Sequence, residues 1–313
     1  ELILEDDGAI AGVNAIGRGN ELVQFRGRNV VLACGGYQGK QEMMSHYVGP
    51  QAQFIRPVSR GGHYNRGEGV RMALSAGAAP CGDFSSFHAQ PVDPRSTDIE
   101  PVVLNYSYGI LIDDAGERFT DEAPGMVDAT YEEVARLIMA QCHGIAFAVF
   151  DSKLDEVENW QVTVRSRVPP IEADSLPELA SAMGVDERNF LATVEAYNQA
   201  CPASDGFDPL QTDGLSTTGL APRKSHWARP IAQGPFRAWP MICSNCFTFG
   251  GVKIDERARV INAEGDPIPG LYAAGEVAGI YYRVYTGATS VMRGAVTGRL
   301  AGGDAALRRN APG

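Results

Sequence analysis

Residues 1–33 show the alternation of apolar and polar positions that is typical of β-strands, and we predict three strands there. The segment 1–16, ELILEDDGAIAGVNAI, predicts a hairpin with Asp7 and Gly8 at its turn. A continuous apolar run follows at 29–33, NVVLA, and such a run is typical of a strand buried on both faces. The beginning of the chain therefore predicts sheet structure that stops at a glycine-rich turn.

Helical spacing of apolar residues begins after that turn. The segment NRGEGVRMALSAGA predicts a glycine turn and a short helix over 70–76, which Gly77 ends. From 81 to 236 the chain becomes richer in proline, serine and charged residues. This change in composition indicates a second domain inserted into the first.

The inserted region combines strand and helix patterns. A short strand is predicted at 108–112, and a buried strand in GIAFAVFDS at 144–152. Three amphipathic segments predict helices, whose N-caps are expected at Asp128, Ser175 and Asp186. The inserted domain is therefore expected to be α+β.

The strand pattern returns towards the end of the chain. GGVKID, 250–255, and GLYAAGE, 270–276, predict two strands joined by a hairpin. The segment 287–309 predicts a closing helix with small residues early. Its apolar residues recur at helical spacing, at Val291, Ala295, Val296 and Leu300.

Composition and charge narrow the class of protein. The 313-residue chain has 44% hydrophobic and 21% charged residues, which is ordinary for a globular protein. Its net charge of −11 argues against nucleic acid as a partner, because phosphate binding needs a basic surface. No apolar run reaches the ~18 residues of a transmembrane segment. Six scattered cysteines predict neither a disulfide framework nor a zinc site, and two packed thiols are favoured over a redox pair at Cys243 and Cys246.

Small residues recur where predicted strands end and where the closing helix begins: Cys34-Gly35-Gly36, Gly275-Glu276 and 287–290. In α/β sheets, ligands bind outside the carboxyl ends of the strands. A helix N-terminus there offers free N–H groups to an electron-rich oxygen, and a carboxylate can accept hydrogen bonds from sugar hydroxyls. Each feature alone fits an ordinary turn, but together they predict a site for a large cofactor such as a dinucleotide.

The order of the motifs resembles that of one family. VVLACGGY, RGEGVRMALSAGA, GERFTDE, FGGVKID…PIPGLYAAGEVAG and GATSVMRGAVTGRLAG follow the order of FAD-dependent flavoproteins of the fumarate reductase/succinate dehydrogenase class. The resemblance covers nearly the whole chain and is most specific over 250–302. APRKSHWA and YYRVYTGATSVMRGAV are most similar to the tricarballylate dehydrogenase-like branch.

This resemblance implies FAD as the cofactor. It implies that Glu276 binds the FAD ribose or ribityl chain, and that Glu68 stands where the family usually has Asp. The backbone of Ser290 and Val291 would meet the pyrimidine edge of the flavin, where a helix N-terminus stabilises negative charge on the N1–C2=O side. The residues expected to contact FAD are Ala33, Cys34, Gly35, Glu68, Gly275, Glu276, Thr289, Ser290 and Val291.

The fold implied by the resemblance is α/β, an incomplete Rossmann-like FAD-binding domain with an inserted α+β capping domain. The predicted FAD-binding domain comprises 1–80 and 237–313, and the capping domain comprises 81–236. Members of the class begin with a strand–GxGxxG–helix unit that holds the FAD pyrophosphate. No such unit precedes Glu1 in this sequence, so we expect the N-terminal βαβ unit to be missing and FAD retention to need a direct test.

The substrate side departs from fumarate reductases. Those enzymes use one His and two Arg for the substrate, and the matching positions here are Phe247, around Met126, and near Tyr285. Arg can bind a carboxylate bidentately, and Tyr can transfer a proton. The catalytic residues expected in this chain are His88, Tyr282, Arg283 and Tyr285, with Tyr281 as a further candidate.

Each of these candidates has a structural alternative. His88 and the tyrosines can simply pack, and Arg283 can be a solvated surface charge. Tyr281 and Tyr282 would face opposite ways on a strand, so both cannot line a site equally. Arg118 is expected to hold its own turn through Asp121 or Glu122.

The expected function is FAD-dependent dehydrogenation or reduction of a CH–CH bond next to a carboxylate or carbonyl, with a tricarballylate-like polycarboxylate as the first substrate candidate. A hydride would pass to FAD and a proton to a protein base. An enzyme resembling 3-ketosteroid Δ1-dehydrogenases is the alternative, and a truncated non-catalytic fragment unable to bind FAD is the alternative of another class. The expected partners are a small carboxylate substrate and an unidentified electron acceptor, with a cytoplasmic location.

Overall fold

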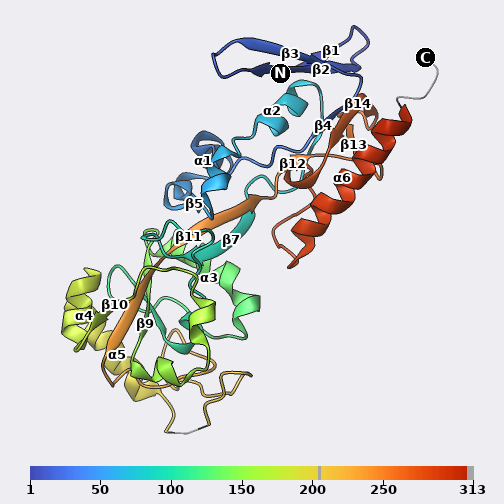
Figure 1. The fold of residues 1–313 in the computed structure, drawn as a ribbon. Coiled ribbons are helices and arrows are strands. Elements are labelled where there is room, and N and C mark those ends of the chain that lie inside the picture. Colours follow the sequence, from blue (N-terminus) through green and yellow to red (C-terminus); the bar gives the residue numbers. More distant parts are fainter. Residues whose placement is uncertain (204–205, 309–313) are drawn as a thin grey trace. The chain divides into compact units, whose positions relative to one another are not determined.

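The computed structural model describes residues 1–203 and 206–308, and it confirms the predicted α/β class (Figure 1). The chain divides into two compact units. Unit 1 comprises Glu1–Ala52, Gly61–His88 and Cys246–Gly313, and unit 2 comprises Gln53–Arg60 and Ala89–Asn245. The chain passes between the units within β7 (Phe87–Val92) and within β11 (Phe236–Thr248), and the two strands pair with each other.

In its described part, unit 1 contains three small sheets and three α-helices. Its elements are β1 (Leu2–Leu4), β2 (Ile10–Ile16), β3 (Leu22–Arg26), β4 (Val30–Leu32), α1 (Gln41–Val48), α2 (Glu68–Ser75), β6 (Pro80–Cys81), β12 (Gly251–Val252), β13 (Arg259–Ile261), β14 (Pro267–Ala273) and α6 (Thr289–Arg308). The predicted hairpin of β1 and β2 is confirmed, and Gly8 at its turn has a φ of 82°.

The sheet β13-β14-β4 holds the site-bearing strand ends. β14 pairs in parallel with β4, from Leu271 opposite Val30 to Ala273 opposite Leu32, so both carboxyl ends lie at one edge of the sheet. The prediction that residues 29–33 are buried on both faces is wrong for β4. Val31 is 41% exposed whereas Leu32 is buried, so only one face of this strand is covered.

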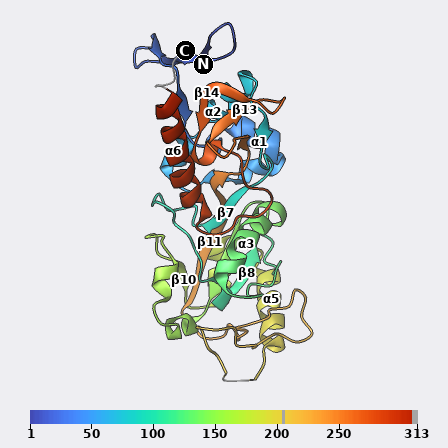
Figure 2. The same cartoon turned by 90° about the vertical axis from the view of Figure 1, so that its right-hand side faces the viewer.

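Helix α6 lies beside β14 (Figure 2), and it begins two residues after the predicted start at 287; the predicted end at 309 lies outside the described residues. Its apolar row, however, does not face the core. The buried positions are Arg293, Thr297 and Ala301, while Val291 and Val296 are 76% and 48% exposed. The face that packs on unit 1 is therefore partly polar. No described helix, α6 included, is long and apolar enough to cross a membrane.

Unit 2 is built on an antiparallel sheet in the order β10-β11-β9-β8. Every residue of β9 is buried, as predicted for this apolar run, because both faces of the sheet are covered. Phe147 and Val149 pack with α4 and α5, while Ala146, Ala148 and Phe150 pack with α3, which follows from the two-residue period of a strand. The elements of unit 2, beyond β7 and β11, are β5 (Arg56–Pro57), β8 (Ile110–Asp113), α3 (Val127–Gln141), β9 (Ala146–Phe150), β10 (Ile171–Ala173), α4 (Leu176–Met183) and α5 (Glu187–Ala200).

Two of the three predicted N-caps in unit 2 are confirmed. The Ser175 hydroxyl accepts a hydrogen bond from the Glu178 N–H, and the Asp186 carboxylate accepts one from the Asn189 N–H. The third prediction is wrong. Asp128 lies inside the first turn of α3, where its negative charge is stabilised by the positive end of the helix dipole. Met126 occupies the N-cap position and makes no side-chain capping bond.

Candidate functional site

The Glu276 carboxylate lies directly after β14, in the short helical turn η6 (Gly275–Val277). Its Oε1 accepts hydrogen bonds from the backbone N–H and the hydroxyl of Thr248, at 2.7 and 3.1 Å. Its Oε2 accepts one from Gln38 Nε2 at 3.4 Å. The carboxylate thus joins the turn after β4, the end of β11 and the end of β14.

The glycine at position 36 is required by this arrangement. A methyl group there would come within 2.1 Å of Thr248 Oγ1 and 2.3 Å of Glu276 Oε1. Burial raises the pKa of Glu276, and hydrogen bonds from Thr248, Gly36 and Gln38 oppose that shift. A carboxylate has about four acceptor sites, so Glu276 can still accept a bond from a sugar hydroxyl.

The end of β4 meets the start of α2. Cys34, the second residue after β4, is exposed, and a methyl group on Gly69 would lie 2.4 Å from its Sγ. Glu68 opens α2, and its Oε2 accepts a hydrogen bond from the Arg66 N–H at 3.2 Å. Two of the segments predicted to contact FAD, 33–35 and Glu68, therefore lie next to each other.

The start of α6 carries the other predicted cofactor residues. The first backbone N–H groups of an α-helix have no acceptor within the helix, so those of Ser290 and Val291 can donate to a ligand, whereas the Thr289 N–H already donates to the Thr286 carbonyl at 3.3 Å. Two tyrosines are held against this turn. The Tyr281 hydroxyl lies 2.8 Å from Thr289 Oγ1, and the Tyr285 hydroxyl lies 3.1 Å from Ser290 Oγ.

These tyrosines belong to an aromatic cluster in unit 1, defined here as His88, Phe247, Phe249, Tyr281 and Tyr285. The ring centroids of His88 and Tyr285 are 4.4 Å apart, and those of His88 and Phe247 are 5.3 Å apart. Phe247 also lies 5.0 Å from Tyr285, with the two rings nearly perpendicular. His88 is 5% exposed, whereas Tyr285 is only half-buried. The structure thus brings two predicted catalytic residues, His88 and Tyr285, into contact.

The other two predicted catalytic residues lie at the surface. Tyr282 is 61% exposed, and its hydroxyl is 3.3 Å from Cys81 Sγ. Arg283 is also exposed, with a φ of 46°. Tyr281, at 8% exposure, faces the cluster instead of Tyr282, in line with the expected opposite orientation of neighbouring side chains.

One residue of the site was not selected from the sequence. Arg293, in the second turn of α6, is 5% exposed, and its guanidinium carbon lies 4.7 Å from the ring centroid of Tyr281 and 5.2 Å from that of Phe247. A charged residue in the same helical row as Thr297 and Ala301 was the only signal in the sequence, and the apolar residues of α6, which were expected to face the core, concealed it.

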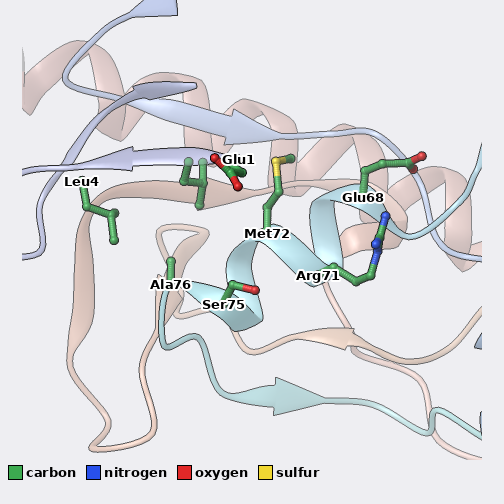
Figure 3. A pocket seen from close by; sticks show the side chains of 8 residues that line it. Glu1, Leu4, Glu68, Arg71, Met72, Ser75 and Ala76 are labelled. Carbon is green, nitrogen blue, oxygen red and sulfur yellow. The ribbon is translucent and has the colours of Figure 1, made fainter. Parts of the chain in front are cut away.

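A separate cavity of about 450 Å³ lies between β1 and α2 in unit 1 (Figure 3). Apolar side chains form much of its lining, and Glu68 and Arg71 add charged groups from α2. The predicted cofactor residue Glu68 is therefore accessible from this cavity. Its lining residues are Glu1, Leu2, Leu4, Glu68, Arg71, Met72, Ser75 and Ala76.

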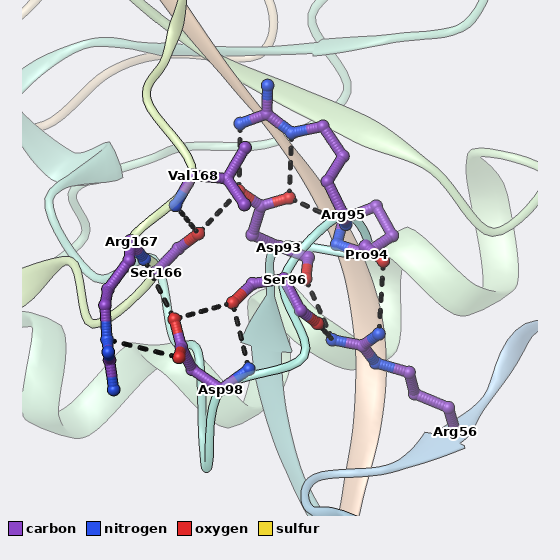
Figure 4. A network of polar contacts seen from close by, with 9 residues as sticks. All are labelled: Arg56, Asp93, Pro94, Arg95, Ser96, Asp98, Ser166, Arg167 and Val168. Atoms are coloured by element: carbon purple, nitrogen blue, oxygen red, sulfur yellow. Dashed lines mark hydrogen bonds and ion pairs between the residues drawn. The ribbon is translucent and has the colours of Figure 1, made fainter.

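Unit 2 contains a dense polar network around the buried Asp93 (Figure 4). The Asp93 carboxylate accepts bonds from Arg95 Nε and Nη2, at 3.0 and 2.9 Å, and from the Ser166 hydroxyl at 2.9 Å. Arg56 donates to the backbone carbonyls of Asp93 and Pro94. Because these groups bind one another and the backbone, we assign the network to holding the loop after β7.

A second buried group in unit 2 involves Arg118 and Lys224. Arg118 binds Glu122 through two hydrogen bonds of 2.7 and 2.6 Å, which is one of the two predicted partners. Lys224 is fully buried and donates to the carbonyls of Ser107 and Gly109. Burial lowers the pKa of Lys224 to about 8, with Glu122 opposing the shift.

Comparison with known proteins places the chain in a family. The model of the FAD binding domain family matches residues 1–291. The NADH:fumarate oxidoreductase of Klebsiella pneumoniae is 27% identical over 310 residues, which cover 98% of this chain and 31% of that protein. The open conformation of a flavocytochrome c3 fumarate reductase superposes with a TM-score of 0.76 at 25% identity, covering 99% of this chain and 52% of that one. The 3-ketosteroid-Δ4-(5α)-dehydrogenase of Rhodococcus jostii, solved with 4-androstene-3,17-dione, superposes with a TM-score of 0.62 at 26% identity, covering 97% and 58%.

The chain belongs to the FAD binding domain family, and FAD is its cofactor. The predicted flavoprotein class is confirmed, and the tricarballylate-like branch stays a prediction. The chain spans less than two thirds of the length of the curated relatives it matches. The residues present fit the flavin end of FAD, because a free helix N-terminus and the Glu276 carboxylate both belong to unit 1.

Proposed function

We propose that this protein is an FAD-dependent oxidoreductase that acts on a CH–CH bond next to a carboxylate or carbonyl group. The observation that carries the proposal is the contact between His88 and Tyr285, with Tyr285 also bonded to the first turn of α6. Membership of the FAD binding domain family supports it, as does the resemblance to a fumarate oxidoreductase and a fumarate reductase.

The chain's own residues divide the work of such a reaction. FAD, when bound, supplies or accepts the hydride. The N–H groups of Ser290 and Val291 would hold the pyrimidine edge of the flavin, and Glu276 would hold its sugar chain. The Tyr285 hydroxyl would give a proton to the second carbon of the bond, or take one from it. His88, packed on the Tyr285 ring, would orient that phenol.

For the substrate we propose a carboxylate of the tricarballylate type. The support is the sequence resemblance to that branch, together with relatives whose names specify fumarate. The aromatic cluster favours one specific alternative, a 3-ketosteroid or similar cyclic ketone. Its partly exposed members, Phe247 and Tyr285, are both aromatic, and aromatic rings suit an uncharged, apolar substrate.

A reductive half-reaction separates these substrates. The flavin-loaded protein is mixed without oxygen with tricarballylate, with a 3-ketosteroid, or with neither, and the flavin absorbance is followed. Bleaching by tricarballylate alone supports the carboxylate, and bleaching by the steroid alone supports the alternative. If dithionite-reduced protein is also not reoxidised by fumarate or by an unsaturated ketone, the proposed activity is wrong.

Tyr285→Phe tests the proton-transfer residue. We expect a loss of roughly 10²- to 10⁴-fold in the rate of flavin reduction by substrate, the usual contribution of general acid–base catalysis. Tyr282→Phe is the matched control, because that exposed phenol lies three positions away in the same loop. Equal effects of the two substitutions would exclude Tyr285 from the chemistry.

A further inference from the structure

Arg293 buries a positive charge that no acid side chain neutralises directly. Its guanidinium is 5% exposed, and within residues 1–203 and 206–308 no carboxylate lies within ion-pair distance of it. Nη1 donates one long hydrogen bond, 3.3 Å, to the carbonyl of Ala278, and Nε is buried without a hydrogen-bond partner. A buried cation left in this state is unfavourable for folding, so it needs another explanation.

Its surroundings explain how the charge is tolerated. The guanidinium lies over the rings of Tyr281 and Phe247, whose negative π faces attract a cation. Burial lowers the pKa of Arg293, and the nearby Glu276, Tyr281 and Tyr285 oppose this shift. An arginine nevertheless stays protonated at neutral pH. A permanent positive charge therefore lies beneath the aromatic cluster.

We propose that Arg293 is a positioning residue of the active site: it fixes the Tyr281 and Phe247 rings and provides the counter-charge for the phenolate of Tyr285. This inference rests on the proposed function. In the reductive direction, bound FAD would supply the hydride for one alkene carbon, and the Tyr285 hydroxyl would give its proton to the neighbouring carbon. The electron pair of the O–H bond stays on the phenolic oxygen, which becomes negative. In the oxidative direction the same phenolate takes the proton back.

The counter-charge would act through a low-dielectric region, where it is weakly screened. Among the residues that the structure describes, the other ionisable side chains at the cluster are His88 on β7, Glu276 on η6 and Tyr281. Glu276 is negative when ionised and disfavours a phenolate, so it cannot replace Arg293. Arg283, the arginine predicted from the sequence, is exposed and therefore cannot do so either.

Chemical rescue distinguishes the effect of the charge of Arg293 from the effect of its packing. Arg293→Ala should lower the rate of substrate-dependent flavin reduction about 10²-fold, as removal of one electrostatic stabiliser typically does, with little change in KM. Guanidinium ion, at concentrations far below those that unfold proteins, should restore much of the rate. Urea has the same planar shape without the charge and should not. Arg299→Ala, on the exposed side of the same helix, is the matched control and should keep the wild-type rate.

A second readout needs no activity. Guanidinium should raise the thermal unfolding midpoint of Arg293→Ala but not of the wild type or of Arg299→Ala, whereas urea should raise none of them. Guanidinium should also return the near-ultraviolet circular dichroism of the tyrosines in Arg293→Ala towards the wild-type spectrum. These measurements still test the site if the wild type reduces none of the substrates, an outcome that would contradict the proposed function alone.

Two results would overturn the inference. One is a wild-type rate in Arg293→Ala, and the other is rescue by urea equal to rescue by guanidinium. If Arg293→Ala does not fold, Arg293→Lys and Arg293→Gln replace it. The lysine keeps the charge and should stay within about 10-fold of the wild-type rate, whereas the glutamine should lose about 10²-fold. Equal rates for lysine and glutamine would then contradict the role of the charge.

Discussion

Each unit buries an arginine, and the two arginines are treated in opposite ways. Arg118 in unit 2 is 9% exposed, binds both oxygens of Glu122, and donates from Nη1 to the carbonyl of Pro222 at 2.8 Å. Arg293 in unit 1 is 5% exposed and has one long bond to a carbonyl, with two aromatic rings beside it. The two side chains are buried to a similar extent, but only Arg118 is fully engaged in hydrogen bonds with its neighbours.

The difference separates structural from functional charge. Burial lowers the pKa of Arg118, but the nearby Glu122 carboxylate has the larger combined effect and raises it. The two charges therefore neutralise each other within the pair. At Arg293 burial prevails and lowers the pKa. A protein that only needed to fold would gain little from a cation at position 293, because its polar groups are incompletely satisfied. We therefore regard unsatisfied burial, rather than burial itself, as the mark of a site.

The largest expected effect on stability is that of breaking the Arg118–Glu122 ion pair. Arg118→Met leaves the Glu122 carboxylate buried and unpaired, which should lower the free energy of unfolding by about 3–5 kcal/mol. Urea unfolding followed by circular dichroism measures it. Arg136→Met is the control, because its pair with Glu132 is 27% and 22% exposed and should be worth about 1 kcal/mol or less. Similar losses in both variants would contradict the comparison.

Lys224 should make the stability of the protein depend on pH in a defined direction. Burial lowers its pKa to about 8 in the folded state, against about 10.4 in an unfolded chain. Between these values the unfolded state binds more protons, so stability should rise with pH. The gain should approach about 3 kcal/mol across the window relative to Lys224→Met, which lacks the proton. Parallel pH curves for the two proteins would show that Lys224 keeps its charge throughout.

A smaller effect on stability is expected from replacing Arg293, whose charge has no acidic partner among the described residues. Arg293→Met removes one weak hydrogen bond and the contacts with two rings, but it also removes a poorly solvated cation. The net loss of unfolding free energy should be about 1 kcal/mol, well below that of Arg118→Met. A double-mutant cycle with Tyr281→Leu isolates the ring contact, which we expect to be worth about 0.5–2 kcal/mol. A loss as large as that of Arg118→Met would mean that both arginines are structural.

The smallest stability effect should come from Glu276→Gln, and it should depend on pH. Because burial raises the folded pKa of Glu276, its contribution to stability is full below the unfolded pKa of about 4.3 and is lost as pH rises through the folded pKa. The variant should therefore gain stability relative to the wild type with increasing pH, while retaining FAD less well after desalting. A stability difference independent of pH would contradict the assigned shift.

Local patterns predicted the elements well where one residue type controls the backbone. Gly8 at the first hairpin and the N-caps Ser175 and Asp186 are examples, because turn and cap preferences act within a few residues. The predictions failed where burial depends on distant neighbours. Val31 is exposed despite its apolar run, and the apolar row of α6 faces outward. Periodicity shows that two faces differ, but it cannot show which face meets the rest of the protein.

The candidate site was predicted in part. Resemblance selected His88, Tyr285 and Glu276, and the structure brings them into the same unit. It did not select Thr248, whose backbone and hydroxyl both bind Glu276, nor Arg293 beneath the rings. These residues act on other side chains rather than on a ligand, so the resemblance gave no reason to select them.

By itself, the sequence determined the class of this protein. The order of glycine-rich strand ends, the carboxylate at position 276 and the closing helix identify an FAD-binding chain, because cofactor contacts depend on short segments whose chemistry is local. The tertiary structure alone decided which tyrosine faces the cluster and which arginine is satisfied. Both depend on side chains that lie far apart in the sequence, and their mutual distances exist only once the chain has folded.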